Sequence, residues 1–208
     1  MALFEFFIAA FVTLLVVVDP LGLVPTFLAI TAGLPAQARR NVALRACLIA
    51  AAILAGSALG GDWLLRTMSI SLPAFRIAGG LLLFSIASEM VFGVRIARQS
   101  RDAEEAIEDH MRNIAAFPLA IPLMAGPGAI TATVLLAGRS GDPVRLAILL
   151  GVIVAVLAVC LAVFTAAGRI GQLIGVTGNV VLSRLLGVLL AALAVQFVID
   201  GVRVALAG

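Results

Sequence analysis

The sequence predicts an all-α membrane protein with six transmembrane helices, of which the first and the fourth are broken. Of the 208 residues, 63% are hydrophobic and 12% are charged, and the mean hydropathy is +1.22. Soluble folds average about 25% charged residues, so this composition excludes an ordinary soluble domain. At about 20 residues per span, six helices account for the whole chain. We therefore expect a single transmembrane domain over residues 1–208.

The first three helices are expected over residues 3–32, 42–61 and 72–93. An apolar run in the first of them is interrupted by Asp19, Pro20, Gly22 and Pro25. Proline lacks a backbone N–H and glycine permits unusual backbone angles, so we predict a break over residues 19–25. Asp62 and Trp63 are expected to end the second helix, with Trp63 at the membrane interface.

Residues 95–112 hold the densest cluster of charge, nine of the 25 charged residues of the chain. Arg98 and Asp102 are one of several oppositely charged pairs spaced four residues apart. Such pairs stabilise a solvated helix, so we predict a short helix in a loop outside the membrane. The alternative is a segment that docks a partner protein.

The other three helices are expected between Arg112 and Arg139, between Arg145 and Arg169, and over residues 180–199. The fourth helix contains the second break, at Gly126-Pro127-Gly128. Asp142 and Pro143 are typical of an N-cap and a first helical residue, so a helix start is expected there. A glycine-rich stretch over 168–178 separates the last two helices.

The third and sixth helices share residues when they are aligned with a shift of 108 positions. Arg76 then falls on Arg184, Gly79 on Gly187, and residues 93–95 on residues 201–203. The two breaks align at a shift of 106, which places Gly22 on Gly128. Two copies of a three-helix unit, about 1–94 and 113–208, would have opposite orientations, as in many secondary transporters. The alternative is chance similarity between two apolar helices.

Arginine counts near the helix ends predict that both termini lie outside the cell and the charged loop in the cytoplasm. With the N-terminus outside, four arginines lie outside: Arg66, Arg139, Arg145 and Arg203. Eight then lie inside: Arg39, Arg40, Arg45, Arg95, Arg98, Arg101, Arg112 and Arg169.

Asp19 is the most informative candidate for a functional residue. A charge at the centre of a bilayer costs about 2.5–3.5 kcal/mol on insertion scales, and intramembrane carboxylates usually serve a function. We predict that Asp19 binds a substrate amine, a cation or a proton. The alternative, which is compatible with this role, is an N-cap for a half-helix that begins at Pro20.

The second break is expected to bind a negatively charged group, whereas Asp19 at the first break would bind a positively charged one. A half-helix that begins near Gly126, Pro127 and Gly128 would present free N–H groups, which suit a carboxylate. With Asp19, Pro20, Gly22 and Pro25 on the other side, the two breaks would together bind a zwitterion such as an amino acid. Thr131 and Thr133 would add hydroxyls, or would bond to their own helix. The alternative is that both breaks only shape the packing of the helices.

Glu89, late in the third helix, is a second candidate and could relay protons. The alternative is a carboxylate that reaches the interface and pairs with Arg95 or Arg98. No Ser/His/Asp set, phosphate loop or paired metal ligands occur in the sequence, so we expect no enzyme activity, no cofactor and no metal. The net charge of +3 is small and dispersed, which argues against a nucleic-acid partner.

The stretches Asp19-Pro20-Leu21-Gly22-x-x-Pro25 and Ile121-Pro122-Leu123-x-Ala125-Gly126-Pro127-Gly128-Ala129-Ile130 resemble the MarC family. This family is also described as the small neutral amino acid transporter family. The start of the third helix, residues 75–80, is similar to the family as well. The resemblance covers essentially the whole chain. It implies a multi-pass protein of the bacterial inner membrane that transports small neutral amino acids such as glycine or alanine.

The leading hypothesis is a secondary transporter of small neutral amino acids that is driven by a proton or sodium gradient and surrounded by membrane lipids. Two alternatives remain open. One is a non-transporting inner-membrane protein of envelope stress, and the other is an exporter of toxic metabolites. Asp19 and the paired breaks favour the first hypothesis over a non-transporting protein.

Overall fold

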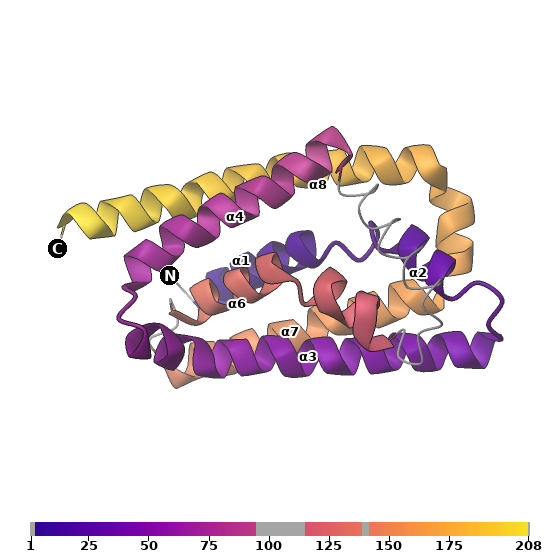
Figure 1. Ribbon diagram of the computed structural model, residues 1–208, viewed down its shortest axis with the longest axis horizontal. Coiled ribbons are helices and arrows are strands. Elements are labelled where there is room, and N and C mark those ends of the chain that lie inside the picture. Colours follow the sequence, from indigo (N-terminus) through magenta and orange to yellow (C-terminus); the bar gives the residue numbers. More distant parts are fainter. Residues whose placement is uncertain (1–2, 95–114, 139–141, 208) are drawn as a thin grey trace.

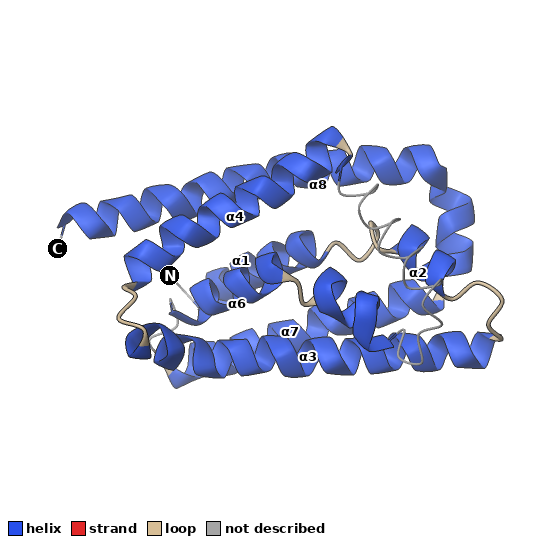
Figure 2. Ribbon diagram, in the orientation of Figure 1, coloured by secondary structure: helices blue, strands red, loops and turns tan. Residues whose placement is uncertain are grey.

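The computed structural model of the chain describes residues 3–94, 115–138 and 142–207, and the elements in these ranges are all helices (Figure 2). The first half contains α1 (Leu3–Val18), α2 (Val24–Ile30), α3 (Ala36–Thr67) and α4 (Leu72–Phe92). The second half contains η1 (Ala115–Met124), α6 (Pro127–Gly138), α7 (Pro143–Thr165) and α8 (Ala167–Ala207).

The helices form three layers (Figure 1). One outer layer is the pair α4 and α8, and the other is the pair α3 and α7. The middle layer consists of α1, α2, η1 and α6, the four pieces of the two broken helices. Helix α1 packs on α6, α7 and α8, whereas α6 packs on α3 and α4. Each broken helix therefore packs mainly against long helices from the other half of the chain.

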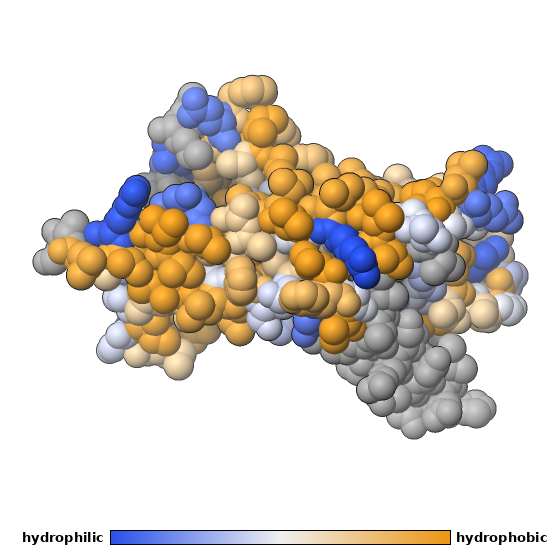
Figure 3. All heavy atoms as spheres, turned by 90° about the horizontal axis from the view of Figure 1, so that it is seen from above, coloured by the Kyte–Doolittle hydropathy of each residue, from blue (hydrophilic) through white to orange (hydrophobic). Residues whose placement is uncertain are grey.

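Four helical segments are long and apolar enough to cross a membrane: Ala36–Thr67, Leu72–Phe92, Pro143–Thr165 and Thr177–Leu206. Their outward faces carry large exposed hydrophobic side chains, among them Leu48, Val154 and Leu185. Figure 3 shows hydrophobic side chains over most of the face seen from above in Figure 1, on the side of α4 and α8. Such a surface is stable in lipid, not in water, because lipid solvates apolar side chains.

Two of the predicted helix starts are confirmed by their caps. The hydroxyl of Ser71 accepts a hydrogen bond of 3.3 Å from the N–H of Ala74 at the start of α4. Oδ1 of Asp142 accepts a bond of 3.0 Å from the N–H of Val144 at the start of α7. Both caps satisfy backbone donors that the first turn of a helix leaves free.

Helix α3 is longer than predicted: Asp62 does not end it but pairs at 2.8 Å with Arg66 one turn later, and the helix continues to Thr67. The element α8 spans Ala167–Ala207 but consists of two helices that meet at a kink within the glycine-rich stretch. It bends at Gly175, where φ is 63° and ψ is 179°. The predicted helix over 95–112 lies outside the described residues.

Helices α4 and α8 meet through a reciprocal contact of two glycines. A Cβ placed on Gly80 would lie 2.7 Å from the carbonyl oxygen of Ala194 and 2.6 Å from Val198. A Cβ placed on Gly187 would lie 3.1 Å from the carbonyl oxygen of Ala87 and 3.0 Å from a methyl of Val91. The three matched pairs, Gly80 with Gly187, Ala87 with Ala194 and Val91 with Val198, share one shift of 107 positions.

The glycine that faces α8 in this contact is Gly80 and not Gly79, which the sequence pairs with Gly187. Gly79 faces α6, where a Cβ would meet the methyl of Thr131. A shift of 107 also places Pro20 on Pro127.

Candidate functional site

The first break occurs where the sequence predicts it. Helix α1 ends at Val18, and Asp19 adopts a φ of 52°, a conformation that is uncommon outside glycine. Four residues then form turns, and α2 begins at Val24 with Pro25 in its first turn. The expected start of the half-helix at Pro20 is wrong, because the left-handed residue sends the chain through a turn first.

The carboxylate of Asp19 is buried, with 2% of the residue exposed, and it joins this turn to α8. Oδ1 accepts a hydrogen bond of 3.0 Å from the N–H of Gly22, which closes the turn. Oδ2 accepts a bond of 3.4 Å from the hydroxyl of Ser183. A Cβ on Gly22 would collide with the carboxylate, so the turn needs glycine there. Asp19 thus caps a turn and contacts a second transmembrane segment at the same time.

The second break differs in its backbone. Residues 115–124 form a π-helix instead of the expected α-helix, and the N–H of Ala125 bonds at 2.8 Å to the carbonyl of Ala120, five residues back. Pro118 and Pro122 each lack the N–H that an α-helix would use, which favours the wider winding. Helix α6 then begins at Pro127, and the carbonyl of Gly126 accepts its first bond, from Ile130 at 3.0 Å.

The second break lies against the end of α1. A Cβ on Gly128 would lie 3.5 Å from a methyl of Val17, two residues before Asp19. The same Cβ would also contact Leu83 and Ile86 of α4. The space beside Gly128 is therefore filled by apolar side chains of α1 and α4.

The two threonines after the second break differ in their contacts. The hydroxyl of Thr133 donates to the carbonyl of Ala129 at 2.7 Å, one turn back in its own helix. This bond corresponds to the alternative in which the hydroxyl bonds to its own helix. Thr131 is buried, and its methyl lies against Gly79 of α4.

A cavity of about 410 Å³ lies on the other side of the first break, between α2 and the first part of α8. Its lining includes Leu21 of the turn, Pro25 and Leu28 of α2, and Gly171, Gly175 and Asn179 of α8. The backbone angles of Gly175 belong to a region that is essentially restricted to glycine. The bend at Gly175 therefore shapes the cavity wall, and only glycine adopts it without strain.

Asn179 and Ser183 are the two site residues that the sequence analysis missed. Asn179 is 7% exposed and lines the cavity, and Ser183 lies one helical turn further along α8, bonded to Asp19. Residues spaced by four lie on one face of a helix. A stripe of small or polar residues at that spacing, Gly175, Asn179, Ser183 and Gly187, interrupts the apolar sequence and could have identified them.

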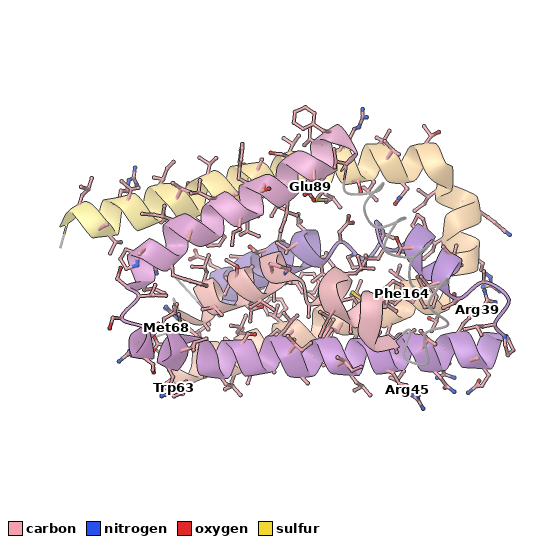
Figure 4. The ribbon with its side chains drawn as sticks, viewed as in Figure 1. Arg39, Arg45, Trp63, Met68, Glu89 and Phe164 are labelled. Carbon is pink, nitrogen blue, oxygen red and sulfur yellow. The ribbon has the colours of Figure 1, made fainter. Side chains whose placement is uncertain are left out.

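A larger cavity of about 620 Å³ adjoins the first one. The two share Leu28, Gly168 and Gln172 in their linings. The larger cavity is also lined by Arg39 and Arg40 from the start of α3 and by Arg169 near the start of α8. Arg40 and Arg169 are exposed, so the cavity opens to the surface at this end of the molecule. Figure 4 shows Arg39 and Phe164, another lining residue, at the same end.

Glu89 lies near the end of α4 and is partly buried (Figure 4). Its predicted partners, Arg95 and Arg98, lie outside the described residues. The role of Glu89 therefore stays a prediction. Within the described ranges, no three His, Cys, Asp or Glu side chains form a group that could hold a metal ion.

Comparison with known proteins gives a match over nearly the whole chain. The family model described as "MarC family integral membrane protein" matches residues 4–206. A UPF0056 membrane protein of Methanocaldococcus jannaschii is 40% identical over 207 residues, which cover 97% of this chain and 98% of the relative. The UPF0056 membrane protein YhcE of Escherichia coli is 36% identical, with 96% and 91% covered. No solved structure matches the chain.

Proposed function

Because the chain belongs to the MarC family of integral membrane proteins, we propose that it is a secondary transporter of small neutral amino acids, driven by a proton or sodium gradient. The names of the relatives say only that they are membrane proteins. The observation that carries the proposal is therefore in the chain itself: the buried carboxylate of Asp19, at a helix break and in contact with a second transmembrane segment.

The position of Asp19 suits an ion-coupling role. A non-glycine residue with a positive φ costs of the order of 1–3 kcal/mol, and such strained residues concentrate at functional sites. Binding a proton or a cation would change the charge of the carboxylate and therefore its bond to Ser183. The ion would thereby alter the contact between the middle layer and α8, which links ion binding to a rearrangement of helices.

Six crossings in two inverted triplets are the topology we propose. The reciprocal Gly80 and Gly187 contact supports it, because matched residues of α4 and α8 exchange places across a local two-fold axis. The shared shift of 107 at Pro20 and Pro127 supports it as well. The start of α1 and the end of α8 lie toward the same end of the molecule, as an even number of crossings requires (Figure 1). Three spans per copy place the two-fold axis in the membrane plane.

The protein resides in the bacterial inner membrane with both termini outside in this proposal. The end that carries Arg39, Arg40 and Arg169 is then cytoplasmic, in agreement with the preference of arginine for that side. The two adjoining cavities open toward the cytoplasm, and Leu21 of the first break lines the smaller of them. Movement of the outer helix pairs against the middle layer would expose this region to the other side in turn.

Uptake into proteoliposomes tests the proposal. The purified protein is reconstituted, and entry of labelled glycine, alanine and serine is followed with an imposed proton gradient, an imposed sodium gradient or neither. We expect one gradient to drive accumulation against the concentration gradient of the amino acid, and empty liposomes to show none. Equal uptake in protein-containing and empty liposomes under every gradient would refute transport of these substrates and favour a non-transporting membrane protein.

A further inference from the structure

The cavity between α2 and α8 is lined by an amide that forms no side-chain hydrogen bond within the residues that the structure describes. Asn179 is 7% exposed and lines the cavity, and its side chain forms no hydrogen bond within residues 3–94, 115–138 and 142–207. A carboxamide offers two donors on nitrogen and an acceptor on oxygen. Buried polar groups almost always have partners, so this amide is available to bind a polar molecule inside the cavity.

We infer that Asn179 binds the polar head of a neutral zwitterionic amino acid in this cavity, an inference that rests on the transport function proposed above. The nitrogen of the amide donates to the substrate carboxylate, and its oxygen accepts from the substrate ammonium group. An α-amino acid carries both groups on one carbon, so a single amide reaches both. The solute therefore binds beside the first break, between α2 and α8, and not at Gly128, where apolar side chains fill the space.

The walls of the cavity define the class of solute. The lining that the structure describes contains apolar side chains, glycines and two amides, Gln172 and Asn179, but no ionisable group. A charged substrate side chain would lose its hydration there without gaining a partner, which is costly. A volume of about 410 Å³ lies within the usual range of small-molecule sites. The cavity thus accepts small neutral amino acids and excludes acidic and basic ones.

The surroundings of Asn179 connect this site to the entrance and to Asp19. Arg39, Arg40 and Arg169 line the adjoining cavity and attract the carboxylate of an approaching amino acid. Asn179 also lies one turn before Ser183, which bonds to Asp19. Solute and coupling ion would therefore bind one helical turn apart on α8, close enough for each to affect the other.

Ligand binding to the purified detergent-solubilised protein tests this inference without requiring transport. Glycine, L-alanine and L-glutamate are titrated, and the dissociation constant is taken from the rise in apparent melting temperature. We expect glycine and alanine, but not glutamate, to stabilise the parent protein. Asn179→Ala should weaken glycine binding about tenfold, the equivalent of about 1.4 kcal/mol. Asn41→Ala, which removes an exposed amide from α3, is the matched control and should bind as the parent does.

A second variant decides the matter if Asn179→Ala does not fold. Gly171 lines the same cavity, and a Cβ there would lie 3.1 Å from a methyl of Leu28, so Gly171→Val reduces the space for a solute. Gly151→Val is the control, because a Cβ on Gly151 meets nothing within 4 Å. We expect Gly171→Val, and not Gly151→Val, to abolish stabilisation by glycine.

The outcomes separate the inference from the proposed transport. If Asn179→Ala binds glycine as tightly as the parent, the proposed site is wrong, while transport by the parent stands. The same holds for Gly171→Val if only that variant folds. Weakened binding in the variant together with no uptake by the parent supports the site and refutes transport. Glutamate binding as tight as that of glycine overturns the assigned class of solute. No binding and no uptake by the parent refutes both.

Discussion

Gly175 offers a direct test of whether the bend in α8 is part of the working structure. Its φ of 63° and ψ of 179° lie in a region that residues with a Cβ avoid, at a cost of the order of 1–3 kcal/mol. A Cβ on Gly175 would meet nothing within 4 Å, so Gly175→Ala introduces backbone strain and no collision. The substitution therefore isolates the effect of the backbone conformation.

The expected size of the effect follows from this cost. A strain of 1–3 kcal/mol reduces the population of the bent state relative to competing states by about 5- to 150-fold. For a chain of this length, about 1 kcal/mol corresponds to a shift of roughly 2–4 °C in melting temperature. We therefore expect Gly175→Ala to lower the apparent melting temperature by about 2–12 °C. Amino acid uptake should fall as well, because the bend shapes the cavity beside Asn179.

Gly151→Ala is the matched control. Gly151 lies in the regular part of α7, and a Cβ there also meets open space. Alanine is favoured over glycine in such a helix by roughly 0.5–1 kcal/mol, so this variant should be slightly more stable than the parent. The assay is the fraction of protein that remains monodisperse by size exclusion after heating in detergent. If Gly175→Ala is as stable and as active as Gly151→Ala, the bend is not required and the reasoning fails.

Three further predictions concern the break and the helix contacts. Asp19→Asn preserves an acceptor for the N–H of Gly22 but removes the charge. The variant should therefore fold and insert, while its uptake no longer depends on the ion gradient. Gradient-driven uptake equal to that of the parent would show that Asp19 is only a turn cap. Gly22→Ala forces a Cβ against the Asp19 carboxylate and should lower the free energy of unfolding by about 1–3 kcal/mol, as measured by the same heating assay. An unchanged midpoint temperature in that assay would show that the turn tolerates a side chain. Gly80→Ala and Gly187→Ala should both destabilise, and Gly80→Ala the more, because its Cβ would lie 2.7 Å from a carbonyl oxygen of the facing helix and that of Gly187 3.1 Å, whereas Gly56→Ala should not. Variants of Gly80 and Gly187 as stable as Gly56→Ala would argue against this helix contact.

The sequence alone determined those features that depend on local chemistry and on the surrounding solvent. The apolar composition determined that the helices face lipid, because no soluble fold exposes so much hydrophobic surface. Ser71 and Asp142 determined where two helices begin, since each caps donors within three residues of itself. The proline and glycine residues of the two breaks determined where the helices of the middle layer are interrupted, because proline removes its own backbone donor wherever it lies.

The tertiary structure decided the features that depend on contacts between distant segments. The glycine-rich stretch 168–178 does separate two helices, but the separation is a kink at the single residue Gly175. The sequence does not tell which of Gly79 and Gly80 faces α8, and only the packed helix pair shows that it is Gly80. Asn179 and Ser183 are ordinary polar residues in the sequence. They lie beside the cavity and Asp19 because α8 packs against α1 and α2, from which more than a hundred residues separate it.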